Sequence, residues 1–412
     1  MGKRMYSPKI VRAAVVKLEE AYKRELREYT TDECAEFNDR LSDAFAEKGQ
    51  QIRAFTAEEQ AYIENELLMT KASWEYWAQR YCRINKDAST IAPMYPLLPS
   101  QEFILKKIGK LEEKIYEGER EDGILLNLLK GGRQIGGSTV AESILAHRST
   151  TQNNLFGLIA ADVPAQSAYL FDMYARMIDG LPPWLRPEIL EKVKDTEIKF
   201  DGGTNVWVGS GKSARGTTGQ RGQLGRGKTL SIGHLSELST WEATDQIQGA
   251  LLPTIPRSPR VFFMFESTAK GRGGWWHEHW LKSRKNIGRF VPIFIPWYAE
   301  PKKFSLTAPE GWVAKETTLA HAKRCEMTGG KWVDGEVRLT KDQLFWYETT
   351  RNDYEESGQL STFLEEYGAA DDDECFQFSG KTIFGAAVVQ RIQDAARPVA
   401  GALEIKPMRD IR

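Results

Sequence analysis

A glycine-rich loop between an apolar run and a helix-like segment is the feature that most constrains the fold of this chain. Residues 131–139 read Gly-Gly-Arg-Gln-Ile-Gly-Gly-Ser-Thr, after the apolar residues 124–129 and before the helix-like residues 140–145. A strand, a glycine loop and a helix in this order present backbone N–H groups and a helix N-terminus to a phosphate. The sequence therefore predicts an α/β fold with a phosphate-binding loop (P-loop).

One position of this loop departs from the usual P-loop spacing, G-x-x-x-x-G-K-[ST]. Gly137 stands where the phosphate-binding lysine is usual, but Lys130 and Arg133 are positive charges close by. Either can contact the β- and γ-phosphates of ATP, and Ser138 is expected to ligate Mg²⁺. An ordinary turn that never meets a nucleotide is the alternative. The candidate nucleotide-binding residues here are Lys130, Gly131, Gly132, Arg133, Gln134, Gly136, Gly137, Ser138 and Thr139.

Composition narrows the class of protein. A chain of 412 residues is longer than a single domain usually is. Its net charge of −1 argues against a protein that binds nucleic acid through a uniformly basic surface, but it is compatible with local basic patches. Its four cysteines show no metal-ligand spacing, which fits a reducing compartment without disulfides. No apolar stretch approaches membrane-spanning length, so we expect no membrane contact.

The pattern along the chain predicts three regions. Residues 1–90 are helical and charged, residues 91–300 form the P-loop core, and residues 301–412 form a lid or linker subdomain. Within the core, apolar runs at 155–160, 204–208, 229–232, 261–265 and 291–295 predict a mostly parallel sheet that is covered on both faces. Residues 209–228 between two of these runs form a basic, glycine-rich loop that contains Arg215, Arg221 and Arg226.

Two strand ends carry further candidate chemistry. The apolar segment 228–235 leads to Ser236 and Glu237, where P-loop enzymes usually place an aspartate for Mg²⁺ followed by a glutamate that activates water. The alternative is a surface glutamate after a strand. The strongly apolar residues 261–265 lead to Glu266, Ser267, Thr268 and Ala269, small polar groups that can sense the γ-phosphate and relay its loss. An ordinary loop after a buried strand is the alternative there.

These segments together resemble the ATPase domain of tailed-bacteriophage terminase large subunits. The resemblance runs from about residue 95 to about residue 384, and it is strongest in the subgroup with a His-Leu-Ser-Glu acidic motif, here residues 234–237. It implies a P-loop NTPase fold of the additional-strand catalytic-glutamate type. It further implies that Gln101 reads adenine, and that an arginine of the loop 209–228, Arg215, Arg221 or Arg226, completes the site of a neighbouring subunit.

The same resemblance implies a function. It implies a DNA-packaging motor that uses ATP and Mg²⁺, forms a ring, and works with double-stranded DNA, a portal protein and a small terminase subunit in the host cytoplasm. The rivals are another nucleic-acid-stimulated ATPase of helicase type and a degenerate P-loop scaffold that does not hydrolyse ATP. Because residues 385–412 are too few for a nuclease sheet, and because the run 371–374 is contiguous and expected to be solvated, we expect no DNA cleavage by this chain.

Overall fold

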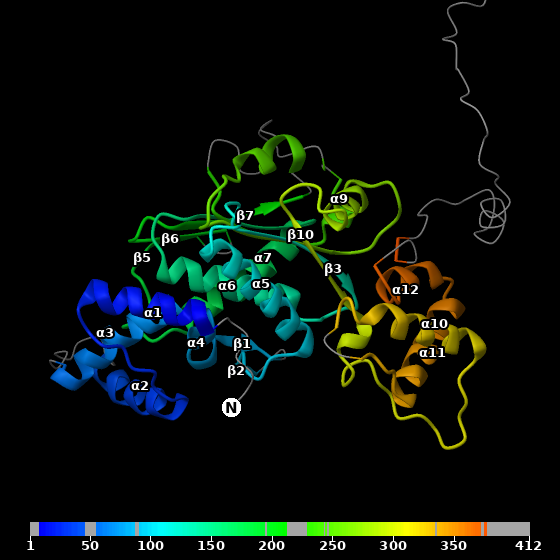
Figure 1. The fold of residues 1–412 in the computed structure, drawn as a ribbon, viewed down its shortest axis with the longest axis horizontal. Coiled ribbons are helices and arrows are strands. Elements are labelled where there is room, and N and C mark those ends of the chain that lie inside the picture. The colour runs from blue at the N-terminus through cyan, green and yellow to red at the C-terminus, as the bar shows by residue number, and fades with distance from the viewer. Residues whose placement is uncertain are drawn as a thin grey trace, which may run out of the picture. The chain divides into compact units, whose positions relative to one another are not determined.

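A mostly parallel β-sheet carries the glycine loop. The computed structural model describes residues 8–45, 55–86, 90–193, 196–211, 229–242, 244, 247–333, 336–371 and 375–376, all within one compact unit, Met1–Gln377. The strands are β1 (Arg83–Asn85), β2 (Ile91–Pro93), β3 (Ile124–Gly131), β4 (Phe156–Ala161), β5 (Ile189–Val193), β6 (Glu197–Phe200), β7 (Asn205–Ser210), β8 (Ile232–Leu235), β9 (Phe262–Thr268) and β10 (Val291–Pro296). Figure 1 shows their arrangement.

The helices of the described residues lie on both faces of this sheet and beyond one of its ends (Figure 1). They are α1 (Pro8–Tyr22), α2 (Thr31–Phe45), α3 (Ala57–Ala72), α4 (Trp74–Arg80), α5 (Pro99–Tyr116), α6 (Gly137–Thr151), α7 (Pro164–Asp179), α9 (Trp275–Arg284), α10 (Glu316–Gly329), α11 (Lys341–Glu356) and α12 (Leu360–Glu366), with short turns η1 (Leu238–Thr240), η2 (Ile247–Leu251), η3 (Leu252–Thr254) and η4 (Trp297–Ala299). None of the described helices is both long enough and apolar enough to cross a membrane.

The order of the strands places β9 between the loop strand and the acidic strand. Among the described residues, eight strands pair in the order β10-β3-β9-β8-β4-β7-β6-β5. The strands from β10 to β7 run parallel, and β6 and β5 pair antiparallel at one edge. The carboxyl ends of β3, β9 and β8 therefore meet at one edge, where α/β sheets bind ligands.

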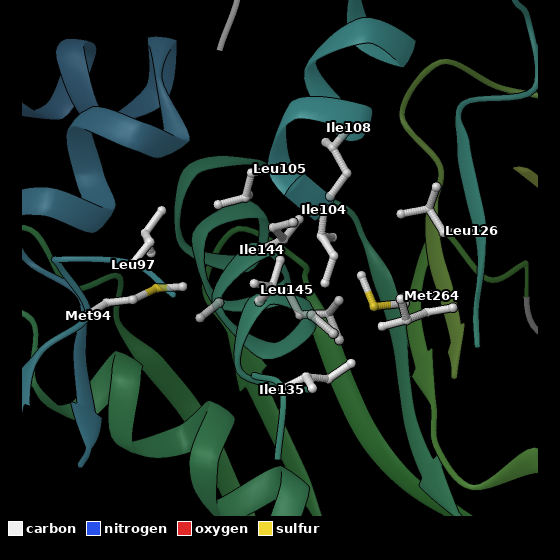
Figure 2. Close-up of a cluster of buried hydrophobic side chains, with 14 of the residues drawn as sticks. Met94, Leu97, Ile104, Leu105, Ile108, Leu126, Ile135, Ile144, Leu145 and Met264 are labelled. Atoms are coloured by element: carbon white, nitrogen blue, oxygen red, sulfur yellow. The ribbon is translucent and has the colours of Figure 1, made fainter. Parts of the chain in front are cut away.

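Each face of the sheet has its own apolar core. Leu126 and Met264 face α5 and α6, and Figure 2 shows them packed with Ile104, Ile144 and their neighbours. The alternate residues of the same strands, such as Leu125 and Phe263, pack on the other face in the cluster that contains Trp276 and Trp280 of α9. Burial on both faces explains why β3 is apolar at nearly every position, as a central parallel strand requires.

The flanking regions are helical. Ser73 ends α3 and caps the N-terminus of α4, so the helical region predicted before the core is divided there. After β10, Trp297 stacks on Tyr347 of α11, and Phe363 of α12 packs against Tyr347 and Tyr367. Aromatic contacts therefore join α11 and α12 to the end of the sheet. The boundaries predicted at residues 90 and 300 stay predictions.

The predicted sheet is confirmed with two differences. The runs at 155–160, 204–208, 261–265 and 291–295 coincide with β4, β7, β9 and β10, whereas the run at 229–232 ends where β8 begins. The antiparallel strands β5 and β6 were not expected. Their sequences, Ile-Leu-Glu-Lys-Val and Glu-Ile-Lys-Phe, mix charges with apolar residues, because β5 at the edge of the sheet and β6 beside it keep contact with water.

Candidate functional site

The glycine loop forms a tight turn between β3 and α6. Gln134 has a φ of 54° and Gly136 a φ of 75°, both in the left-handed region, and α6 begins at Gly137. A Cβ atom on Gly136 would lie 2.6 Å from Nε2 of Gln101, so a side chain here would be strained by φ and by contact. The local geometry thus matches a strand, glycine loop and helix that can bind phosphate through backbone N–H groups.

Neighbouring segments hold this loop in place. The Ser100 hydroxyl donates to the carbonyl oxygen of Ile135 over 2.6 Å, and Oε1 of Glu300 accepts a 2.7 Å hydrogen bond from the Ser100 backbone N–H. Nζ of Lys303 donates to the Gln134 carbonyl oxygen over 2.7 Å. The loop is therefore tied to the start of α5 and to the segment after β10, and no sequence pattern pointed to Glu300 or Lys303.

Lys130 lies between two carboxylates. Its Nζ is 2.7 Å from Oε1 of Glu237 and 3.8 Å from Oε1 of Glu266. Burial acts to lower the pKa of Lys130, but the two negative charges and the hydrogen bond to Glu237 outweigh it and raise the pKa. Lys130 is therefore protonated, and its ammonium group lies at the carboxyl end of β8, beside Glu237.

Arg133 points elsewhere. Its guanidinium forms an ion pair with Glu366 of α12, and 65% of its side chain is exposed. Of the two candidate replacements for the missing lysine, the structure thus brings Lys130 together with Glu237 and connects Arg133 to the C-terminal helices.

The position of the missing lysine is closed by its neighbours. A Cβ atom on Gly137 would lie 2.7 Å from Cδ2 of Leu128 and 2.9 Å from Oε2 of Glu266. Both neighbours belong to central strands, so a side chain at residue 137 would have to displace one of them. Glycine is therefore the residue that fits at this position.

Glu266 is the centre of a buried polar cluster. The side chain is fully buried, and its Oε1 accepts hydrogen bonds from the hydroxyls of Ser138, over 2.5 Å, and Ser236, over 2.9 Å. Burial acts to raise the pKa of Glu266, but Lys130 and His234 outweigh it and hold the pKa well below its usual range. The carboxylate is thus ionised beside the P-loop hydroxyl.

His234 and Glu142 extend this cluster inward. Nδ1 of His234 is 2.6 Å from Oε1 of Glu142 on α6, and Nε2 lies 3.2 Å from Oε1 of Glu266 without forming a hydrogen bond. Burial acts to lower the pKa of His234, yet the two carboxylates raise it to about 9. Sequence reasoning missed this pair, although a glutamate inside the apolar segment 140–145 was a usable signal.

The residues after Glu266 contact both the loop strand and the acidic turn. Thr268 lies opposite Lys130 in the parallel register of β3 and β9. The Ser267 hydroxyl accepts a 3.0 Å hydrogen bond from the Ser239 backbone N–H and donates to the Ser239 hydroxyl over 2.8 Å, while Ala269 is buried. Residues 267 and 268 thus connect Lys130 with the turn that carries Glu237, whose own φ of 55° is left-handed.

The remaining candidate residues do not contact Lys130, Glu237 or Glu266 in any hydrogen bond or ion pair of the described residues. Gln101 is buried; its Oε1 accepts from the Leu98 backbone N–H over 3.0 Å, and its Nε2 donates to the Gly136 carbonyl oxygen over 3.4 Å, so it touches the loop. Thr139 lines a small cavity with Tyr169 and Met173 of α7, away from the Glu266 cluster. Arg215, Arg221 and Arg226 lie outside the described residues.

One expectation about acidic residues was wrong. Asp371 is buried and forms an ion pair with Arg284 of α9, because the chain after α12 folds back against that helix. It is therefore not solvated, and residues 372–374 lie outside the described residues.

Oxygen groups suited to Mg²⁺ gather at the start of α6. No group of three or more His, Cys, Asp or Glu side chains with metal-binding geometry occurs among the described residues. Mg²⁺ in nucleotide sites is commonly held by one or two carboxylates together with hydroxyls, water and substrate phosphates. The Ser138 hydroxyl beside the ionised Glu266 fits such a site.

Comparison with known proteins gave matches among solved structures. No family model and no curated protein matches the chain. The large terminase of bacteriophage HK97 is 14% identical, with a TM-score of 0.44 over 70% of this chain and 54% of that one. The large terminase of a thermophilic bacteriophage is 14% identical, with a TM-score of 0.35 over 53% of this chain and 50% of that one. This chain therefore spans about half the length of each of these two terminases.

Further matches include nucleotide complexes and a single domain. Structures of the same thermophilic bacteriophage terminase with ADP and with ATP-γ-S are also similar to this chain. The large terminase ATPase domain of Thermus phage P74-26 is 16% identical, with a TM-score of 0.33 over 47% of this chain and 82% of that one. The described strands of this chain thus form a mostly parallel sheet with a strand, glycine loop and helix at its carboxyl edge, and the solved structures named above are of phage large terminases.

Proposed function

We propose that this chain is an ATP hydrolase, the motor subunit of a viral DNA-packaging terminase. The observation that carries the hydrolase assignment is the position of Lys130, which comes from the start of the glycine loop and lies 2.7 Å from Glu237 at the end of the acidic strand. A phosphate-binding cation and a base for water thus meet at the carboxyl edge of the sheet.

Each residue has a role in this proposal. Lys130 and the backbone N–H groups of residues 131–139 hold the phosphates, and Ser138 holds Mg²⁺, which neutralises charge on the β- and γ-phosphates when bound. A phosphate at Lys130 competes with Glu237 for its ammonium group. The released carboxylate of Glu237 then accepts the proton of the attacking water.

The packaging role rests on the sequence resemblance in the segments 131–139, 233–241 and 266–271. In this role the subunits form a ring at a portal protein in the host cytoplasm, receive DNA with a small terminase subunit, and contact the backbone of double-stranded DNA through charge. Residues 266–269 relay loss of the γ-phosphate, Gln101 reads adenine, and Arg215, Arg221 or Arg226 acts on a neighbour's nucleotide. Ser267 supports the relay because it contacts Ser239 beside Glu237.

Two other functions remain candidates. A nucleic-acid-stimulated ATPase outside packaging has the same site, and a non-hydrolysing scaffold is favoured by Gly137 and Ser236, which depart from the usual P-loop and acidic motifs. The three differ in what they do with ATP, DNA and a portal protein, so they can be separated by measurement.

The test is ATP hydrolysis by the purified chain, with and without double-stranded DNA. Glu237→Gln should lower hydrolysis by about 10²–10⁴-fold, the usual contribution of a general base, while binding of an ATP analogue survives. The control is Glu278→Gln on the exposed face of α9. Hydrolysis by Glu237→Gln at the parental rate would refute the base assignment, and no hydrolysis by the parent under any condition would favour the scaffold. Stimulation by single-stranded but not double-stranded DNA would favour the helicase-like rival.

A further inference from the structure

We propose that Glu266 supplies the carboxylate of the Mg²⁺ site, from the strand next to the one on which P-loop enzymes usually carry it. This rests on the proposed ATP hydrolysis and assigns the metal ligands within that site. Ser236 stands where an aspartate is usual, and the register of β8 and β9, which pairs Leu235 with Phe265, brings Glu266 next to Ser236. In this proposal the carboxylate is still present, but it is carried by β9 instead of the neighbouring strand β8.

Hydrogen bonds connect Glu266 to the metal-binding hydroxyl. Oγ of Ser138 donates to Oε1 of Glu266 over 2.5 Å, a length typical of a charge-assisted hydrogen bond. Because the hydroxyl proton is directed at the carboxylate, the lone pairs of the Ser138 oxygen are left for a cation. Ser236 donates to the same oxygen over 2.9 Å, so the residue that replaced the aspartate orients the new carboxylate.

The second oxygen of Glu266 faces the glycine loop. Oε2 is buried and has no hydrogen-bond partner among the described residues, and it lies 2.9 Å from the place where a Cβ atom of residue 137 would stand. A buried carboxylate oxygen without a partner is costly. Oε2 of Glu142 is also buried without a partner among the described residues, so the contact with Ser138 is what distinguishes Glu266. Because residue 137 is glycine, no side chain comes between Oε2 of Glu266 and the backbone at the start of α6.

The two buried glutamates of the cluster differ in their contacts. Glu266 contacts the P-loop hydroxyl of Ser138 over 2.5 Å. Glu142 offers a comparison, since it is equally buried and contacts His234, but its hydrogen bonds do not reach Ser138. If the network were purely structural, loss of the charge at Glu142 or at Glu266 should have the same effect on metal binding. If Glu266 belongs to a metal site, only its loss should weaken metal binding.

The experiment measures binding of Mn²⁺, a spectroscopic substitute for Mg²⁺, to the protein with a non-hydrolysable ATP analogue, by electron paramagnetic resonance. Glu266→Gln should lower Mn²⁺ affinity by at least about 10–100-fold, the usual cost of losing even an outer partner of a metal ligand. Binding of the analogue in excess EDTA should not weaken. Glu142→Gln, as the control for a buried charge, should change Mn²⁺ affinity by less than about threefold, within the scatter of an indirect effect.

A second pair of variants keeps the test decisive if Glu266→Gln unfolds. Ser236→Asp alone should weaken folding, because it places two carboxylates side by side. Ser236→Asp combined with Glu266→Gln should restore Mn²⁺ affinity, because the acid returns to the usual strand. Parental Mn²⁺ affinity in Glu266→Gln, or no recovery in a folded double variant, would overturn the assignment of Glu266. Failure of the parent to bind the analogue, with or without metal, would instead overturn the proposed function.

Discussion

Nζ of Lys130 lies 2.7 Å from Oε1 of Glu237, although the two residues are 107 positions apart and β9 separates their strands in the sheet. The lysine side chain crosses over β9 to reach the acidic turn. In our proposal the ammonium group of Lys130 binds either the carboxylate of Glu237 or a phosphate of the nucleotide. Nucleotide binding at Lys130 therefore releases Glu237 to act as the base.

The first prediction separates Lys130 from Arg133. Lys130→Met should lower the affinity for an ATP analogue by at least about tenfold, because hydrogen bonds to charged groups contribute about 1.5–3 kcal/mol. Arg133→Ala should change it little, since Arg133 pairs with Glu366. Titration with a fluorescent analogue measures both, with thermal unfolding as the check that Lys130→Met is folded. Equal losses in the two variants would contradict this prediction.

The second prediction concerns pH. The pKa of His234 is raised to about 9 in the folded protein, above the ordinary value of about 6.5 in the unfolded chain. The charged His234 therefore stabilises the fold fully below about pH 6.5, and this contribution is lost as the pH rises through about 9. The free energy of unfolding in urea should fall over this window by on the order of 3 kcal/mol more in the parent than in His234→Asn. Parallel curves for the two proteins would argue against it.

The third prediction concerns the contact between the glycine loop and α12. Arg133→Ala should speed backbone hydrogen exchange in residues 360–366, because the ion pair between Arg133 and Glu366 is removed. Arg351→Ala is the matched control, since Arg351 pairs with Glu355 within α11 over 3.2 Å. Exchange in α12 that is unchanged in Arg133→Ala, or equally changed in both variants, would show that this ion pair does not hold the helix.

The fourth prediction tests an arginine acting between subunits. Arg215→Ala subunits mixed with Glu237→Gln subunits should regain part of the hydrolysis that each lacks alone, because an intact arginine and an intact base then meet at mixed interfaces. The same mixture with Arg221→Ala or Arg226→Ala identifies which arginine acts. If no mixture recovers activity, the trans arrangement loses its support.

The sequence allowed much of the sheet to be predicted, because its central strands are buried on both faces. Segments such as 261–265 are apolar without interruption, and strand and helix flank the glycine loop in sequence. Strand β6, next to the edge strand β5, escaped prediction because Glu197 and Lys199 alternate with apolar residues over only four positions. A short, charged strand has no periodicity that separates it from a loop.

The candidate site was predictable as a set of residues but not as a set of contacts. Glu237 and Ser138 follow from motif spacing, whereas the choice between Lys130 and Arg133 depends on where each side chain points. Glu266 was assigned to coupling because its place at a strand end suggested it. The register between β8 and β9, which no local pattern encodes, is what puts it beside Ser138 and Ser236.

The packing around Gly137 links this position to Glu266. Because the ends of the Glu266 and Leu128 side chains fill the space beside residue 137, a Gly137→Lys substitution requires at least one of them to move. Movement of Glu266 would in turn disturb its contacts with Ser138 and Lys130. The glycine at residue 137, the lysine at the start of the loop and the carboxylate on the neighbouring strand therefore form one interdependent arrangement, in which a change at one position alters the surroundings of the other two.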